Sequence, residues 1–123
     1  MAKAKILIVE DDQFLQEMYQ GQLEVEGFEV VTANDGKAGL QKIKKELPHL
    51  VLLDVLLPKM GGYEVLKAIK TDPNTKDIKV ILLTNLSQKE DVQKGEALGA
   101  DDYLIKAHFM PNEVISKIKQ HLG

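Results

Sequence analysis

A cluster of carboxylates directly follows the first apolar run of the chain and could bind a divalent cation. The stretch "ILIVEDDQ" (6–13) places Glu10, Asp11 and Asp12 side by side. Adjacent carboxylates repel one another, and burying part of their charge is costly unless a cation offsets it. A hard cation such as Mg²⁺, which prefers oxygen ligands, would relieve the repulsion. The other interpretation is a solvated helix start, where the helix dipole favours negative charge.

Three further polar residues stand at the ends of later apolar runs, namely Asp54 after "LVLL", Thr84 after "KVILL" and Lys106 after "DYLI". An aspartate beside a bound cation can attack phosphorus and form an acyl phosphate. A hydroxyl and an ammonium group can then bind the phosphoryl oxygens and neutralise the developing charge. Taken alone, each residue is also typical of an ordinary strand or surface, so the hypothesis rests on their combination.

Short apolar runs alternate with stretches of helical spacing along the whole chain. The runs predict strands over 4–9, 28–33, 50–54, 79–84 and 102–105, and the spacing predicts helices over 13–26, 36–46, 63–70, 88–98 and 111–122. Strict alternation of strand and helix indicates an α/β fold, with a parallel sheet covered by helices on both faces. In such sheets ligands bind outside the carboxyl ends of the strands, where the polar residues named above fall.

A few named residues carry the predictions for the first and the fourth helix. The spacing in 13–26 rests on the apolar residues Phe14, Leu15, Met18, Leu23 and Val25. Ser87 with Glu90 three positions later predicts a capping box at the start of the fourth helix.

Composition bounds the class of protein. The 123 residues suit one domain, 1–123, with a real core, and the net charge of -3 offers no strong attraction to nucleic acid or membrane. All 16 basic residues are lysine, so the planar arginine fork that many base and phosphate readers use is absent. Cysteine is absent too, which excludes thiolate metal sites. We find no signal peptide and no run of about 20 apolar residues, so a cytoplasmic protein is expected.

Four motifs resemble the receiver domain of bacterial two-component response regulators over the whole chain. They are "KILIVEDDQ" (5–13), "LLDVLLPKMGGYEVL" (52–66), "ILLT" (81–84) and "ADDYLIKA" (100–107). The resemblance implies a flavodoxin-like fold, in which five parallel strands have the order 2-1-3-4-5. It also implies a signalling switch that catalyses its own phosphorylation rather than a conventional turnover enzyme.

The resemblance further implies roles for the polar residues. Asp54 would be the phosphoacceptor, while Thr84 and Lys106 would bind the phosphoryl oxygens. Thr84 would then act with Tyr103 as a switch that changes the face formed by the fourth helix, fifth strand and fifth helix.

A metal site is implied as well, occupied by Mg²⁺ or Mn²⁺. Asp11 and Asp54 would bind the ion directly, and Glu10 would act through water. The backbone carbonyl of Leu56 would complete the protein ligands, whereas Asp12 would be peripheral and could cap the following helix.

The chain departs from the family pattern at several positions. Ala107 stands where a proline in a cis peptide bond is usual, so the Lys106–Ala107 bond is either trans in an altered loop or a strained cis bond. Asn85 stands where a small residue is usual and could narrow access to Asp54. Leu56 and Leu86 are apolar at the two positions that tune hydrolysis in the family. We therefore expect slow loss of the phosphoryl group.

The implied partners are a sensor histidine kinase or phosphotransfer protein, and a downstream target or an output domain missing from this chain. Direct nucleic-acid or membrane binding is not expected. A flavin carrier is disfavoured because "EDDQ" (10–13) would repel a phosphate, and an aspartyl phosphatase would need a second aspartate at the position of Leu56. The alternative that stays open is a degenerate receiver that only binds partners. The histidines are expected on the surface, with His108 as the one that could approach the site.

Overall fold

The computed structural model describes residues 4–123, so the first three residues of the predicted domain lie outside the described part. The strands are β1 (Lys5–Val9), β2 (Glu29–Ala33), β3 (Leu50–Leu53), β4 (Lys79–Thr84) and β5 (Asp102–Ile105). The helices are α1 (Gln13–Val25), α2 (Gly36–Glu46), α3 (Gly62–Thr71), α4 (Lys89–Ala97) and α5 (Pro111–Leu122), with a short 3₁₀ helix, η1 (Lys106–His108), before α5. All ten predicted elements are present, with ends within one residue of the predicted positions.

All strand pairs are parallel, and the strand order is β2-β1-β3-β4-β5. This confirms the order that the resemblance implies. The central strands β1, β3 and β4 are almost entirely buried, whereas the edge strands β2 and β5 are half-buried. Continuous apolar runs suit strands that are covered on both faces.

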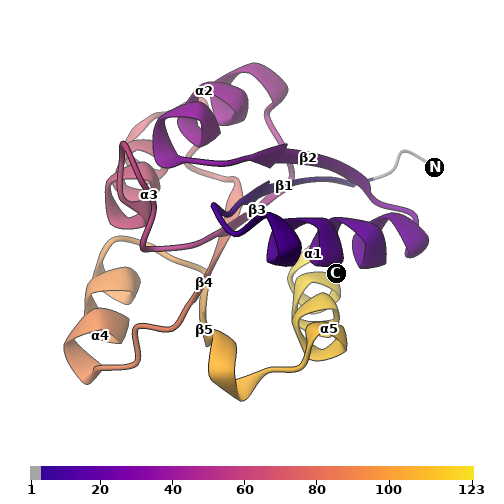
Figure 1. Cartoon of the computed structure of the whole chain (residues 1–123). Coiled ribbons are helices and arrows are strands. Elements are labelled where there is room, and N and C mark those ends of the chain that lie inside the picture. The colour runs from indigo at the N-terminus through magenta and orange to yellow at the C-terminus, as the bar shows by residue number, and fades with distance from the viewer. Residues whose placement is uncertain (1–3) are drawn as a thin grey trace.

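Helices cover both faces of the sheet (Figure 1), and an apolar cluster lies on each face. α1 and α5 cover one face, where Leu23 and Ile118 pack against strand residues such as Ile8. α2 and α3 cover the other face, where Ile43 and Leu66 pack in the second cluster. α4 lies on that same side but contributes only Gly95 as a buried residue. Because α4 buries so little, we expect it to be less stable against local unfolding than the other helices.

The apolar residues assigned to α1 do not all face the core. Phe14 and Val25 belong to the spacing that predicts this helix, but they are 74% and 85% exposed. The residues that α1 buries are instead Gln16, Tyr19 and Leu23. These three follow the three- and four-residue steps of a helix face, and the polar member belongs to the stripe.

Helix ends also refine the sequence interpretation. The backbone N–H of Gln88 donates to the Asp91 carboxylate at 3.2 Å, so the capping interaction of α4 lies one residue later than the predicted pair of Ser87 and Glu90. α2 ends at Glu46 and is capped by Leu47, which has a left-handed backbone with φ 47° and is followed by Pro48. α1 ends before Gly27, whose φ is 95°.

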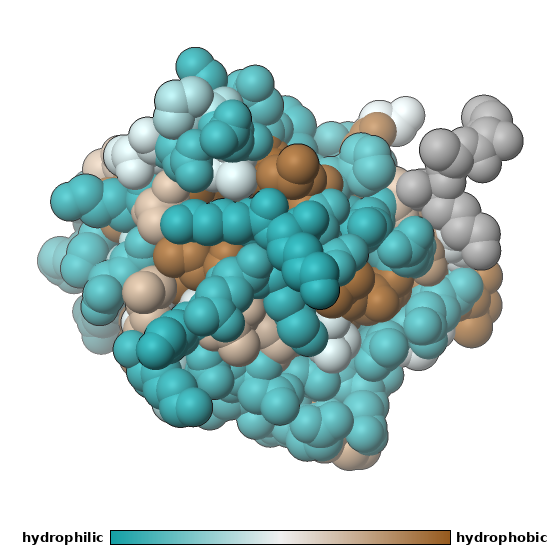
Figure 2. Space-filling model, turned by 90° about the horizontal axis from the view of Figure 1, so that it is seen from above, coloured by the Kyte–Doolittle hydropathy of each residue, from teal (hydrophilic) through white to brown (hydrophobic). Residues whose placement is uncertain are grey.

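Seen from above, most of the surface is hydrophilic and the apolar surface forms separate areas (Figure 2). Among residues 4–123, the large apolar side chains that are exposed are Phe14, Val25, Leu47, Leu56 and Met110. Within residues 4–123, no helix is both long enough and apolar enough to cross a membrane.

Candidate functional site

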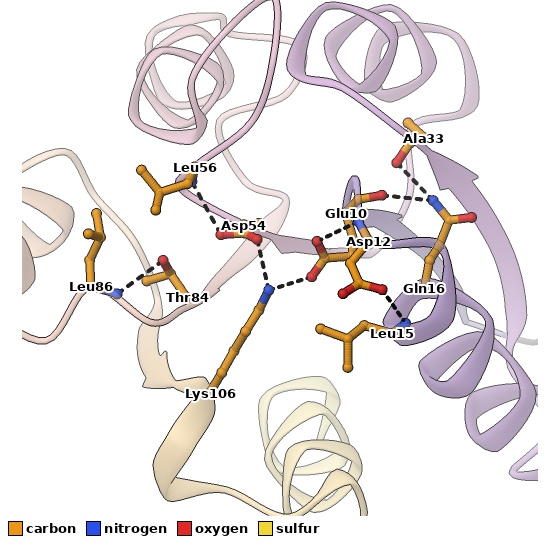
Figure 3. Close-up of polar contacts among 10 residues, drawn as sticks. All are labelled: Glu10, Asp12, Leu15, Gln16, Ala33, Asp54, Leu56, Thr84, Leu86 and Lys106. Atoms are coloured by element: carbon orange, nitrogen blue, oxygen red, sulfur yellow. Dashed lines mark hydrogen bonds and ion pairs between the residues drawn. The ribbon is translucent and has the colours of Figure 1, made fainter.

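Lys106 bridges two buried carboxylates at the carboxyl edge of the sheet (Figure 3). Its Nζ lies 2.5 Å from Oε1 of Glu10 and 2.8 Å from Oδ2 of Asp54. Glu10 follows β1, Asp54 follows β3 and Lys106 follows β5, so the strand order brings three distant segments together. The carboxylate side chains are only 5% and 9% exposed, and the ammonium group offsets the cost of burying them.

The second oxygen of each carboxylate accepts a backbone N–H. Oε2 of Glu10 accepts from the N–H of Asp12 at 3.1 Å, and Oδ1 of Asp54 accepts from the N–H of Leu56 at 3.2 Å. These bonds hold both carboxylates in fixed orientations toward the same space. Such preorganised groups need little rearrangement when a ligand enters.

Burial and charge shift the acid–base properties of this group in definite directions. Burial raises the pKa of Glu10, and the nearby Asp54 charge adds to the effect despite the opposing hydrogen bond from Lys106. Burial alone would lower the pKa of Lys106, but its hydrogen bonds to Asp54 and Glu10 outweigh burial and raise it. The ammonium form of Lys106 is therefore strongly favoured at neutral pH.

Three carboxylates converge at this edge in a way that suits a divalent cation. Glu10, Asp11 and Asp54 each offer an oxygen, and these oxygens lie within 4.8 Å of one another. Two of the side chains are buried and that of Asp11 is exposed, so the cluster opens to solvent on one side. Oxygen ligands combined with an open side suit Mg²⁺ or Mn²⁺, which keep bound waters.

Asp12 does not join this cluster. Its carboxylate accepts from the backbone N–H of Leu15 at 3.1 Å and caps the start of α1. The helix cap that the sequence analysis considered for Asp12 is present.

Gln16 is a residue that the sequence analysis missed. Gln16 is 3% exposed, and the two N–H groups of its Nε2 are shared among three acceptors, namely the carbonyl oxygens of Glu10 at 3.0 Å and Ala33 at 3.1 Å and Oδ1 of Asn34 at 2.8 Å. Figure 3 shows the amide reaching from α1 to the end of β2 and to the acidic loop. The signal in the sequence was a polar side chain in step with Tyr19 and Leu23 on the buried face of a helix.

Thr84 and Tyr103 lie to the β4 side of Asp54. Thr84 is fully buried at the end of β4, and its Oγ1 accepts from the N–H of Leu86 at 3.3 Å. The phenol of Tyr103 donates to the carbonyl of Leu86 at 2.7 Å, so both side chains are bound to the same short loop. Burial, with a smaller contribution from Tyr63, raises the pKa of Tyr103.

α4 rests closely on the Tyr103 ring. A Cβ on Gly95 would lie 3.0 Å from Cδ2 of Tyr103 and 2.9 Å from Cδ1 of Leu82. The phenol of Tyr63 donates to the Asp91 carbonyl of α4 at 2.8 Å, and the ammonium of Lys94 lies 4.7 Å from the centre of the Tyr63 ring. The Tyr63 hydroxyl therefore ties α4 to α3, while the Tyr103 hydroxyl ties the loop that leads into α4 to β5.

The loop after Asp54 is packed without room for additional side chains. A Cβ on Gly62 would lie 2.1 Å from the Asp54 carbonyl oxygen, and a Cβ on Gly36 would lie 1.8 Å from the Met60 carbonyl oxygen. The Gly62 N–H also donates to the Val55 carbonyl at 2.8 Å. Glycine at these positions allows α2 and α3 to press on the loop and fix the position of Asp54.

The loop after β5 contains the Lys106–Ala107 peptide bond, which the sequence left open as either cis or trans. Residues 4–123 contain no cis peptide bond, so the Lys106–Ala107 bond is trans, and Lys106–His108 forms a 3₁₀ helix. Asn85 is exposed and lines a groove together with Lys106 and Phe109. His108 is exposed, and no hydrogen bond joins its ring to the carboxylate cluster within the described residues.

Comparisons with known proteins agree with this geometry. The family model for the response regulator receiver domain matches residues 6–119. The alkaline phosphatase synthesis transcriptional regulatory protein PhoP of Bacillus subtilis is 39% identical over 115 residues, which are 94% of this chain and 47% of PhoP. The phosphate regulon transcriptional regulatory protein PhoB of Klebsiella pneumoniae is 38% identical over 115 residues, which are 94% of this chain and 50% of PhoB. The chain thus spans about half the length of the curated relatives it matches.

Solved structures give the same result. The chemotaxis response regulator CheY4 of Vibrio cholerae is similar with a TM-score of 0.90 and 32% identity, covering 97% of this chain and 98% of CheY4. The Mn²⁺-bound form of the response regulator Rcp1 is similar with a TM-score of 0.80 and 32% identity, covering 89% of this chain and 85% of Rcp1. This chain belongs to the response regulator receiver domain family of two-component signalling.

Proposed function

We propose that residues 1–123 form a receiver domain that accepts a phosphoryl group on Asp54 and changes its partner-binding surface in response. The observation that carries the proposal is the Lys106 bridge between Asp54 and Glu10. It places the Asp54 nucleophile, the Lys106 ammonium group and the Glu10 carboxylate together at one edge of the sheet. The proposed donor is a sensor histidine kinase or a phosphotransfer protein.

The cation that we assign to this site is Mg²⁺, with Mn²⁺ as a substitute. Asp11, Asp54 and the Leu56 carbonyl would bind it directly, and Glu10 would act through water. The close carboxylate oxygens and the Mn²⁺-bound relative Rcp1 support this assignment. When bound, the ion would neutralise charge on the transferred phosphoryl group.

The proposed transfer makes one bond and breaks one bond. An Asp54 carboxylate oxygen attacks phosphorus as the bond from phosphorus to the donor nitrogen breaks, and the donor imidazole keeps the electron pair and takes up a proton. Lys106 already contacts Oδ2 of Asp54, so a short movement of its Nζ would bring it to a phosphoryl oxygen. The Thr84 hydroxyl would give up the hydrogen bond that it accepts from the Leu86 N–H and would donate to another phosphoryl oxygen.

The switch follows from what that exchange does to the loop after β4. Thr84 and Tyr103 both bind this loop at Leu86. Movement of Thr84 toward the phosphoryl group would therefore shift the Tyr103 ring, and with it α4, which packs on that ring. The downstream partner, whether a target protein or an output domain, would bind the face formed by α4, β5 and α5.

The surface around the site suits a protein donor. Phe14, Leu56 and Met110 are 74%, 60% and 64% exposed. Phe14 lies in the first turn of α1 after the acidic loop, Leu56 lies in the loop after Asp54, and Met110 directly precedes α5. Exposed apolar side chains beside a polar site are typical of a docking surface for another protein.

The experiment is an intact-mass measurement after incubation with acetyl phosphate, with Mg²⁺ or with EDTA. The expected result is a gain of one phosphoryl group that requires Mg²⁺ and is lost in Asp54→Ala. The matched control is Asp77→Ala, which removes an exposed aspartate and should be phosphorylated normally. If acetyl phosphate and a phosphorylated histidine kinase both fail as donors, the protein is a receiver that only binds partners.

A further inference from the structure

Gln16 contacts the acidic loop from two directions. Its side-chain amide donates to the Glu10 carbonyl at 3.0 Å, and its backbone N–H donates to the Asp12 carbonyl at 2.9 Å. Asp11 lies between these two carbonyl groups. One residue of α1 therefore holds the backbone on both sides of the carboxylate proposed to bind the cation directly.

The same amide fastens this loop to the neighbouring strand. The Ala33 carbonyl at the end of β2 accepts from the Gln16 amide at 3.1 Å and from the Glu10 N–H at 3.1 Å. Oδ1 of Asn34 accepts a further bond from the amide at 2.8 Å. The acidic loop is thereby fixed relative to β2 as well as to α1 (Figure 3).

Burial makes these bonds effective. Gln16 is 3% exposed, so the carbonyl groups it serves have little access to water as an alternative partner. An apolar residue of similar size would fill the space but leave buried acceptors unpaired, and the loop would gain freedom. The side chain of Asp11 is exposed and therefore depends on its backbone for its position.

We propose that Gln16 is a positioning residue for the cation site, acting through the Glu10–Asp12 backbone on the Asp11 and Glu10 carboxylates. The inference rests on the proposed function, because it assumes that these carboxylates bind Mg²⁺. Gln16 does not itself contact the cation or the phosphoryl group. Its contribution is to the affinity for Mg²⁺ and not to the chemistry at Asp54, which lies on a different strand.

The test compares Gln16→Met with Gln22→Met, which changes a half-buried glutamine near the other end of the same helix. Mg²⁺ is titrated against each ¹⁵N-labelled protein, and dissociation constants are taken from amide shifts of residues 10–12 and 54. Loss of the side-chain hydrogen bonds to the Glu10 carbonyl and to the end of β2 should weaken Mg²⁺ binding about 5- to 20-fold in Gln16→Met, whose backbone N–H can still donate to Asp12. Gln22→Met should match the wild type.

A purely structural role would give a different pattern. It would lower the melting temperature of Gln16→Met in EDTA without changing the Mg²⁺ dissociation constant. Phosphorylation by acetyl phosphate at saturating Mg²⁺ should stay within about twofold of the wild type if only cation positioning is lost. If Gln16→Met does not fold, Gln16→Asn replaces it in the test, because it keeps a buried amide on a side chain one methylene shorter. The Mg²⁺ dissociation constant of that variant is then compared with that of the wild type.

The outcomes separate the two proposals. Equal Mg²⁺ affinity in a folded Gln16 variant and the wild type would overturn the role of Gln16 and leave the proposed function intact. Weakened Mg²⁺ binding in the variant, together with no phosphorylation of the wild type, would overturn phosphoryl acceptance and support the positioning role. Absence of Mg²⁺ binding by the wild type would overturn both.

Discussion

Replacing Lys106 by methionine removes the ammonium group that bridges Glu10 and Asp54 while keeping an apolar stem of similar length. The two carboxylates would then be buried beside each other without that counter-charge. Their side chains are only 5% and 9% exposed, so water offers limited compensation. We expect the variant to be clearly less stable than the wild type in the absence of divalent cations.

The magnitude follows from the geometry. Removing one partner of a buried ion pair costs about 3 to 5 kcal/mol. Lys106 serves two carboxylates, but the neighbouring Asp11 is exposed and the cluster opens to solvent there. We therefore expect a loss of about 2 to 4 kcal/mol, somewhat less than for a fully buried pair. With a urea m-value of about 2 kcal/mol per molar, the midpoint should fall by roughly 1 to 2 M.

The assay is urea unfolding followed by circular dichroism, in EDTA and in millimolar Mg²⁺. Mg²⁺ should stabilise Lys106→Met more than the wild type, because the ion supplies the positive charge that the variant lacks. Lys67→Met removes an exposed lysine from α3 and serves as the control. If Lys106→Met equals the wild type in EDTA, Lys106 does not offset the carboxylate charge and the reasoning is wrong.

Three further predictions follow from packing and burial. Gly62→Ala should lower the free energy of unfolding, measured with heat or urea, by about 1 to 3 kcal/mol or more, because its Cβ would clash with the Asp54 carbonyl. Gly21→Ala, whose Cβ would have nothing within 4 Å, should raise the free energy of unfolding by about 0.5 to 1 kcal/mol. Burial raises the pKa of all three tyrosines above the ordinary 10, so absorbance at 295 nm should show less phenolate at pH 10 in the folded protein than in the unfolded protein. Because folding favours the neutral phenols, their contribution to stability is complete below pH 10 and is lost as pH rises through the raised pKa values. The phosphorylated protein should lose its phosphoryl group slowly, because Leu56 and Leu86 cannot orient a water, and a half-life of seconds at room temperature would contradict this.

Much of the fold could be predicted because its signals are local. Apolar runs that end in polar residues marked every strand, and the gaps between them had helical spacing. The carboxyl ends of parallel strands share one edge, so Glu10, Asp54 and Lys106 could be expected to meet there before any distance was known. Their contacts of 2.5 and 2.8 Å agree with that expectation.

The remaining features depend on contacts between distant segments. Phe14 and Val25 looked like core residues by hydropathy but are exposed, because the buried stripe of α1 runs through Gln16 instead. The contribution of Gln16 depends on the carbonyl of Ala33, which only tertiary structure brings near. The trans Lys106–Ala107 bond was equally undecided by sequence, because local energetics and the family pattern pointed in opposite directions.

The most direct test identifies the residue that receives the phosphoryl group. The protein is incubated with acetyl phosphate and Mg²⁺ and then reduced with borohydride, which converts an aspartyl phosphate to homoserine, and its peptides are sequenced by mass spectrometry. The account predicts homoserine at position 54 alone, and none when EDTA replaces Mg²⁺. Homoserine at position 11 or 12, or a phosphoryl group found on a histidine instead, would contradict the assignment of Asp54 as the phosphoacceptor.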